Sequence, residues 1–118
     1  MLYGYKEKDA LNIKKALDVV HGQDVTLISG SGKEEETVGD ILEKEGAEAF
    51  QAMDFSILMF LNFDDGMIDK TLKAFPKDVK RPIFCTTTER NVNWKLSDLI
   101  KDLLEEHDFF MKKGKGGV

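Results

Sequence analysis

The sequence predicts a small α/β fold with a doubly wound, mainly parallel four-stranded sheet in the order 2-1-3-4. Short apolar segments alternate with segments in which apolar residues recur at intervals of three and four, and this alternation occurs twice along the chain. Alternating strands and helices form parallel sheets with helices on both faces, because right-handed crossovers pack in this way. We therefore expect two β-α-β-α halves whose first and third strands are neighbours in the sheet.

The first half supplies two expected strands and two expected helices. Residues 1–5 form a short apolar strand, and residues 9–20 carry apolar side chains at helical intervals. The compact apolar run within residues 24–29 predicts the second strand. Thr37 has the side chain of an N-cap and predicts the start of the second helix, which ends at Gly46.

The second half repeats this order. Residues 55–63 are almost continuously apolar, which predicts a central strand that helices cover on both faces. Residues 67–75 predict the third helix, residues 83–88 the fourth strand, and residues 96–107 the last helix, whose apolar pattern is the most regular. The stretch between the halves, residues 47–54, fits either a short helix or a connection.

Length, charge and cysteine content restrict the class of protein. The chain of 118 residues is long enough for one domain, with residues 1–111 in the folded unit and residues 112–118 as a flexible tail. A net charge of -5 disfavours binding to nucleic acid, which requires a clustered basic surface. A single cysteine, no signal-peptide pattern and no apolar run long enough to span a bilayer predict a cytoplasmic protein without a membrane partner.

The predicted topology places a crevice at the carboxyl ends of the strands, where ligands bind in doubly wound sheets. Side chains with hydroxyl, amide or indole groups follow the predicted strands at this edge. The candidate ligand-binding residues are Ser29, Asn62, Thr87, Thr88, Asn91, Asn93 and Trp94. Three of them have structural alternatives. Trp94 also suits an anchor that packs the last helix against the sheet, and Asn91 and Asn93 are also natural turn and N-cap residues.

No catalytic machinery is evident near these residues. The sequence offers no paired general acid and base, and Cys85 lies inside an apolar strand, where a thiol is usually a core side chain. We therefore predict no catalytic residue, no cofactor and no metal site, and a non-enzymatic small-molecule-binding or regulatory interaction module. The alternative is a magnesium-dependent enzyme acting on a phosphorylated or nucleotide-like ligand, with Asp64 and Asp65 holding the metal, although both acids also suit a helix cap.

The second half of the chain resembles a known bacterial family. The residues that carry the resemblance are Thr88, Asn91, Asn93, Trp94, Leu96, Leu99 and Glu106-His107, preceded by the strand, helix and strand of residues 58–85. This pattern is similar to that of the family catalogued as domain of unknown function 3783. The chain departs from the family where Glu89-Arg90 separates Thr88 from Asn91, and where Lys95 stands in place of Ser or Thr. The resemblance implies a family and no activity.

The edges of the predicted sheet suggest self-association. In the order 2-1-3-4 the edge strands are residues 24–29 and 83–88, and neither carries the proline or inward-pointing charges that usually blunt an edge. Five apolar residues fall outside the helix faces that cover the sheet: Phe50, Met53, Phe109, Phe110 and Met111. A two-fold homodimer would cover them, and packing onto the edges of their own domain is the alternative. We predict the homodimer.

Overall fold

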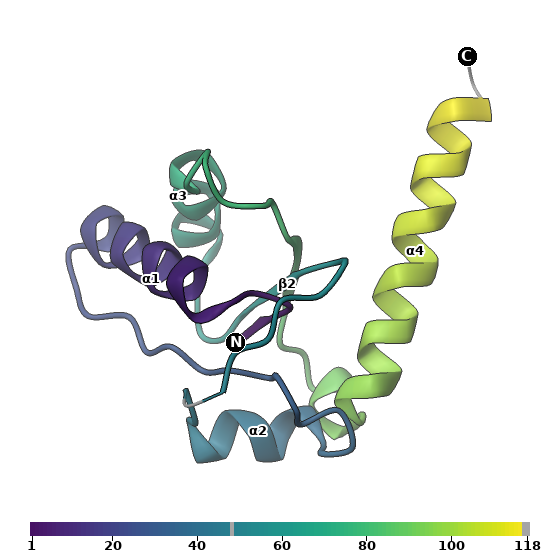
Figure 1. Ribbon diagram of the computed structural model, residues 1–118, viewed down its shortest axis with the longest axis horizontal. Helices are drawn as coiled ribbons and strands as arrows, with labels where there is room; N and C mark the ends of the chain where they lie inside the picture. Colours follow the sequence, from purple (N-terminus) through teal and green to yellow (C-terminus); the bar gives the residue numbers. More distant parts are fainter. Residues whose placement is uncertain (48, 117–118) are drawn as a thin grey trace.

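A computed structural model describes the backbone of residues 1–47 and 49–116 and the side chains of residues 1–47 and 49–106. The elements of the described chain are β1 (Leu2–Tyr3), α1 (Glu7–His21), α2 (Val38–Lys44), β2 (Ile57–Phe60), α3 (Asp65–Ala74), β3 (Ile83–Thr86), the 3₁₀ turn η1 (Asn91–Asn93) and α4 (Leu96–Gly116). Figure 1 shows the strands between the helices, with α4 extending well beyond them.

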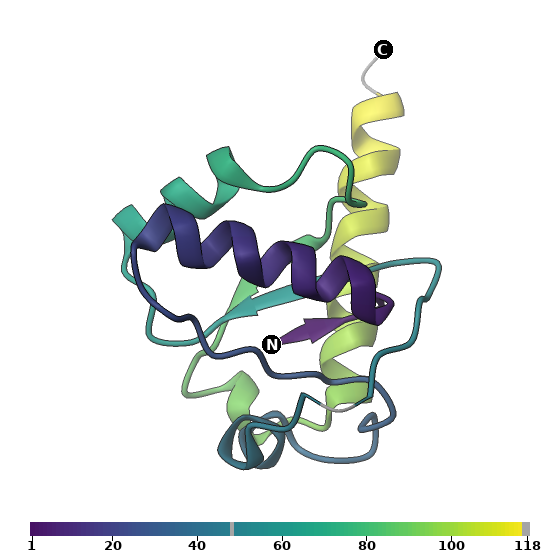
Figure 2. The ribbon, with the colours of Figure 1, turned by 60° about the vertical axis from the view of Figure 1, so that its left-hand side comes forward.

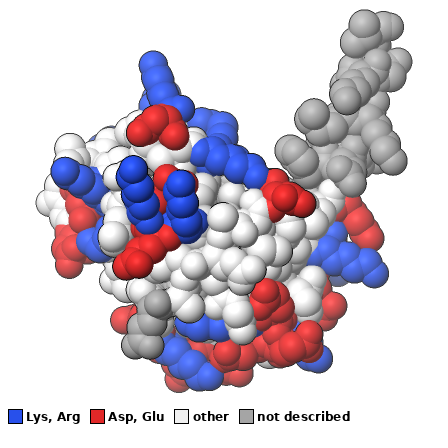
Figure 3. All heavy atoms as spheres, in the orientation of Figure 1, with Lys and Arg blue, Asp and Glu red and all other residues white. Residues whose placement is uncertain are grey.

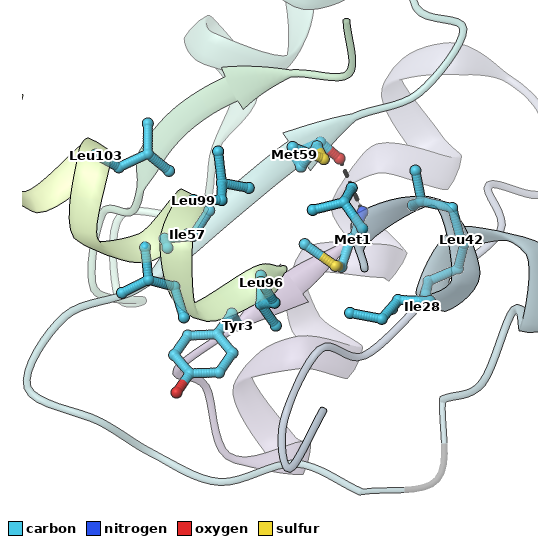
Figure 4. Packing of buried hydrophobic residues seen from close by; sticks show 12 residues of the cluster. Met1, Tyr3, Ile28, Leu42, Ile57, Met59, Leu96, Leu99 and Leu103 are labelled. Carbon is cyan, nitrogen blue, oxygen red and sulfur yellow. Dashed lines mark hydrogen bonds between the residues drawn. The ribbon is translucent and has the colours of Figure 1, made fainter. Parts of the chain in front are cut away.

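Helices cover both faces of the sheet, because the strands place successive side chains on opposite faces. The cluster under α1 and α3, called here the α1–α3 cluster, contains Leu2, Tyr5, Ala10, Ile13, Leu17, Leu58, Phe60, Phe75 and Val79. The α2–α4 cluster on the other face contains Met1, Tyr3, Ile28, Val38, Ile41, Leu42, Ile57, Met59, Leu96, Leu99, Ile100 and Leu103 (Figure 4). Figure 2 shows α1 in front of the sheet and α4 behind it.

The sheet differs from the predicted sheet in the number and direction of its strands. The described residues form a three-stranded sheet in the order β1-β2-β3. β2 and β3 are parallel, but β1 runs antiparallel to β2, with Leu2 opposite Leu58. Of the strand predicted at residues 24–29, only one bridge between Leu2 and Ser29 is formed. The prediction of a four-stranded, mainly parallel sheet in the order 2-1-3-4, built from two β-α-β-α halves, is therefore wrong.

The direction of β1 relative to β2 follows from where the chain enters β2. After α2 the chain reaches the carboxyl end of β1, where the Met53 N–H donates to the Gly4 carbonyl oxygen at 3.0 Å. The Ser56 hydroxyl donates to the same oxygen at 3.3 Å. Because β2 begins beside the end of β1, it must run in the opposite direction.

Gly4 permits this close crossing of two chain segments. Its φ of 87° is in the left-handed region, and a Cβ at this position would lie 2.1 Å from the Phe55 carbonyl oxygen. Only a residue without a side chain fits such a site. Gly4 is thus a steric requirement of the antiparallel arrangement.

Met1 and Met59 form a reciprocal hydrogen-bonded pair at the opposite end of β1. The Met59 N–H donates to the Met1 carbonyl oxygen, and the Met1 amino group donates to the Met59 carbonyl oxygen, both at 2.8 Å (Figure 4). Burial lowers the pKa of this amino group from 8.0 to about 6. The group is therefore mostly neutral at pH 7.

The two helices on the second face begin side by side and cap each other. The Val38 N–H at the start of α2 donates to the Trp94 carbonyl oxygen at 2.8 Å. In return, the first two N–H groups of α4 donate to the carbonyl oxygens of Glu36 and Glu34, at 2.8 and 2.9 Å. The Thr37 side chain caps α2, as the sequence predicts, by accepting the Asp40 N–H. N–H groups at a helix start have no partner inside the helix, so each helix start satisfies the other.

No helix in the described part of the chain is both long and apolar enough to cross a membrane.

The structure describes only some of the residues on which the predictions of self-association and of a flexible tail rest. Of the apolar residues that led us to predict self-association, Phe50 packs against the α1–α3 cluster and Met53 is exposed. The side chains of Phe109, Phe110 and Met111 lie outside the described ones. The flexible tail at residues 112–118 also stays a prediction.

We expect Gly4→Ala to destabilise the fold by more than about 2 kcal/mol, because a methyl group would overlap the Phe55 carbonyl and the backbone would keep a positive φ. Gly22→Ala is the matched control, since Gly22 also has a positive φ, of 64°, but a Cβ there meets nothing within 4 Å. The control should lose only about 1 kcal/mol. Urea unfolding measures the free energy of unfolding of both variants. Equal decreases would contradict the close approach of Gly4 to the Phe55 carbonyl.

A chain with a free amino group at Met1 should gain stability as the pH rises from 6 to 8. In this interval the unfolded chain binds the proton, with a pKa near 8.0, whereas the folded chain has already released it, with a pKa of about 6. The gain is roughly 2–3 kcal/mol and is complete above pH 8. Urea midpoints at about pH 5.5 and about pH 8.5 test this sign. A midpoint that falls or stays constant would show that the amino group is solvated.

Candidate functional site

A cavity of about 370 Å³ lies between α1, the segment that follows α1, and the end of β2. Its apolar lining includes Ile13, Leu17, Val25, Leu27, Leu58 and Phe60. The polar residues that line it include Lys14, Gln23, Asp24, Thr26, Glu45 and Asn62. The cavity therefore combines an apolar floor with polar groups that are mostly exposed.

The cavity exists because the segment after α1 does not form a strand. Gly22 ends α1 in a left-handed conformation. The chain then approaches β1 only near Ile28, whose carbonyl oxygen accepts the Leu2 N–H at 2.8 Å. Val25 and Leu27 still pack against the α1–α3 cluster, but they make no ladder with β1. The apolar side chains of residues 24–29 thus contribute to packing without forming a strand. Because no strand fills the position beside β1, space remains next to α1.

Lys14 is held at the cavity by two carboxylates. Its Nζ lies 2.7 Å from Asp18 Oδ2 and 2.6 Å from Asp24 Oδ1. The hydrogen bond to Asp18, followed by that to Asp24, raises the pKa of Lys14. The same bond from Lys14, followed by the Val25 N–H, lowers the pKa of Asp18. Lys14 therefore stays protonated and can offer a charge and donors, but it cannot accept a proton as a general base does.

The predicted ligand-binding residues fall in three places. Asn62 lines the cavity in the turn after β2, with a left-handed φ of 61°. Ser29 is fully buried beside β1, and its hydroxyl donates to the Ala49 carbonyl oxygen. The remaining residues belong to the segment between β3 and α4: Thr87, Thr88, Asn91, Asn93 and Trp94. Only Asn62 among them lines the cavity.

The segment between β3 and α4 uses its polar groups to fold on itself. Thr88 and Asn91 bond reciprocally, since the side chain of each accepts the backbone N–H of the other, at 3.0 and 2.9 Å. Asn91 Nδ2 also donates to the Thr86 carbonyl oxygen at 3.0 Å. The Thr87 hydroxyl donates to the Phe60 carbonyl oxygen at 3.0 Å, which ties the segment to β2. These contacts fix the loop, and the proposed ligand contacts of its side chains stay predictions.

Trp94 connects this loop to the core. Its side chain is half-buried and packs against the α2–α4 cluster. The Arg90 guanidinium lies 5.9 Å from the centroid of the indole ring, a distance at which a cation is attracted to the ring face. Of the two roles that the sequence leaves open, this arrangement matches the anchor.

The acids and the thiol singled out by the sequence have local structural roles. Asp64 is the N-cap of α3 and accepts the Met67 N–H at 2.8 Å, and Asp65 lies in the first helical turn. Within the described residues, no group of three or more His, Cys, Asp and Glu side chains is placed to hold a metal ion. Burial raises the pKa of the half-buried Cys85 to about 11, so its thiol stays protonated at neutral pH.

Of the residues that line the cavity, sequence reasoning selected only Asn62 as a ligand contact. Lys14 and Asp18 have the spacing of an ion pair on a helix, and this spacing is the one local signal that pointed to them. Nothing in the sequence shows that Asp24 joins this pair or that Asn62 lines the same cavity. The cavity is lined by α1, the segment that follows it and the end of β2, together with Met1, Leu2, Glu45 and Met67.

We expect Asn91→Ala to lower the free energy of unfolding by about 1–2 kcal/mol, because it leaves the Thr88 N–H and the Thr86 carbonyl without a partner. Asn93→Ala is the matched control, since its side chain is exposed and makes only a long contact of 3.4 Å to the Glu89 carbonyl. The control should lose less than about 0.5 kcal/mol. Urea unfolding gives the free energy of unfolding of both variants. A larger decrease for Asn93→Ala than for Asn91→Ala would contradict this description of the loop.

Comparison with known proteins gives one family match, over part of the chain, and no activity. No curated protein and no solved structure matches the chain. The family match covers β2, α3, β3, η1 and the first part of α4, and it leaves out α1 and the segment after α1. Residues 56–110 match the model of the family described as Domain of unknown function (DUF3783), and this match supports the family resemblance.

Proposed function

We propose that this chain is a small-molecule-binding module whose ligand occupies the cavity beside α1. The observation that carries the proposal is the cavity itself, with a volume of about 370 Å³, an apolar floor and a few polar groups. Sites for small molecules have volumes of about 300–1,000 Å³ and are lined mainly by apolar side chains with a few polar groups that orient the ligand. The cavity has these properties, and its size suits a ligand at the small end of the range.

The lining favours a ligand with an apolar body and one neutral polar end. Leu17, Leu27 and Phe60 provide apolar contact along the floor. At the rim, Asn62 supplies an amide, while the charges of Lys14 and Asp24 are already paired with each other. A charged ligand would have to lose its hydration and compete with this ion pair. A hydroxyl or amide group avoids both costs.

Binding without turnover is the role that fits the titratable groups of the lining. A general base works best when its pKa is near the working pH, and the pKa of Lys14 is raised instead. The carboxylates of Asp18 and Asp24 are engaged by Lys14. A module of this kind regulates a partner or carries its ligand. A single cysteine, which cannot form an internal disulfide, is consistent with the cytoplasm as the compartment that we propose.

Val25→Phe tests the proposal by filling the cavity, because Val25 lines it and is half-buried. Val19→Phe is the matched control: it makes the same change on α1 at a side chain that is 77% exposed and lies outside the cavity. The probes are hexanol, hexanoate and hexylamine, which share an apolar chain and differ in the charge of the head group. Amide chemical shifts in ¹H–¹⁵N spectra report where each probe binds.

We expect hexanol to shift the amide signals of Ile13, Val25 and Asn62 in the wild type and in Val19→Phe. In Val25→Phe the affinity should fall at least about tenfold, the effect of losing roughly 1.4 kcal/mol of binding free energy. No shift of these signals with any probe up to millimolar concentration would overturn the proposed site. Tighter binding of hexanoate or hexylamine would keep the site and overturn the neutral polar end.

A further inference from the structure

The described residues cover one edge of the sheet and leave the other open. At the outer edge of β1, the Leu2 N–H donates to the Ile28 carbonyl oxygen, and the Gly30 N–H donates to the Leu2 carbonyl oxygen, at 2.8 and 2.9 Å. β3 is the opposite edge, and within the described residues only β2 pairs with it. All of β2 is buried, whereas the first three residues of β3 are half-buried and the last is exposed. The free edge of the sheet is therefore that of β3.

The register of β3 against β2 shows which backbone groups point to the free edge. The N–H groups of Ile83 and Thr87 donate to carbonyl oxygens of the β2 segment, at 2.8 and 2.9 Å. Backbone groups of successive residues in a strand point to opposite sides, so those of Phe84 and Thr86 point outward. The carbonyl oxygen of Pro82 points outward as well, and proline has no N–H to offer.

We propose that this edge pairs, antiparallel, with the same edge of a second copy of the chain, about a two-fold axis at Phe84. Phe84 of each copy then donates its N–H to the carbonyl oxygen of the partner's Phe84. The Thr86 N–H of each copy donates to the carbonyl oxygen of the partner's Pro82. Two bonds between the Phe84 residues and one from each Thr86 make four, and the two three-stranded sheets become one continuous sheet.

The proposed pairing lacks two hydrogen bonds of a regular antiparallel pair, one at each end of the paired segment, and neither leaves a backbone group without a partner. A regular antiparallel pair would also need an N–H at Pro82 donating to the Thr86 carbonyl oxygen. Pro82 has no such group, and the Thr86 carbonyl oxygen already accepts Asn91 Nδ2 at 3.0 Å. Every backbone donor and acceptor that faces outward between Pro82 and Thr86 thus has a partner in the dimer. The outward backbone groups of β3 are thus complementary to those of a second copy of β3. This self-complementarity favours a second copy of the chain over another extended peptide as the partner.

The side chains of β3 agree with the same pairing. No charged residue occurs from Pro82 to Thr88, whereas protected edges usually carry lysines or inward-pointing charges. The axis places Ile83 opposite the partner's Cys85 on one face and the two Phe84 side chains opposite each other on the other face. All three side chains are half-buried in the single chain. Cross-strand apolar and aromatic pairs of this kind stabilise antiparallel strands.

Sedimentation equilibrium at concentrations of about 10–100 µM is the first test. The wild type should approach twice the chain mass of 13.4 kDa, and a mass of one chain at every concentration would overturn the proposal. Thr86→Pro removes the outward N–H and places a ring at the edge, so it should be folded and monomeric. Thr86→Ala, the control, keeps the N–H and should stay dimeric. A folded Thr86→Pro that remains a dimer would place the interface elsewhere and overturn the edge pairing.

Cross-linking tests the register and does not depend on the proline variant. In the proposed pair, Ile83 and the partner's Cys85 form a non-hydrogen-bonded pair with Cα atoms about 4.5 Å apart, close enough for a disulfide. With the oxidant diamide, which takes up the two electrons and two protons that the thiols release, Ile83→Cys should give a covalent dimer on a non-reducing gel. The wild type and Ile83→Cys combined with Cys85→Ala should not. A folded Ile83→Cys that gives no covalent dimer would overturn the register.

Discussion

The antiparallel pairing of β1 with β2 determines the arrangement of the other elements. It depends on the reciprocal bonds between Met1 and Met59 and on the absence of a side chain at Gly4 where Phe55 crosses. Because β1 is reversed, its amino end lies at the same side of the sheet as the carboxyl ends of β2 and β3. Within the described residues, β1 and β2 are therefore not the parallel pair whose crossovers leave in opposite directions, and the crevice expected at their carboxyl ends is not formed. A cavity of about 370 Å³ opens beside α1 instead.

Much of the local structure could be predicted from the sequence, since apolar spacing records which side of an element is buried. The third helix was predicted at residues 67–75 and lies at Asp65–Ala74, and the fully buried strand predicted within residues 55–63 is Ile57–Phe60. The directions of the strands could not be predicted, because an apolar strand buries the same side chains in a parallel pair and in an antiparallel pair. The error at residues 24–29 has a related cause: apolar side chains there pack into the core without a strand ladder.

The candidate site was harder to predict than the fold for a different reason. Thr88 and Asn91 were selected because their side chains can bind a ligand, and the same groups bond to each other's backbone. Composition cannot distinguish a polar group aimed at a ligand from one that holds its own loop. The cavity depends on Lys14, Asp24 and Asn62, which come from three segments, and no local spacing relates them. Charged side chains of both signs are interspersed on the face shown in Figure 3, so charge gives no second signal there.

The mutual capping of α2 and α4 bears on how the chain divides into folding units. The first N–H groups of α4 depend on carbonyl oxygens at Glu34 and Glu36, which lie outside the segment of residues 56–110 that the family model recognises. An excised segment would expose these donors and lose β1 as well, so we do not expect it to fold autonomously. We expect the start of α2 and the start of α4 to exchange their amide hydrogens as one cooperative unit, because opening either one breaks the hydrogen bonds of the other. The segment that the family model matches therefore does not coincide with a cooperative folding unit.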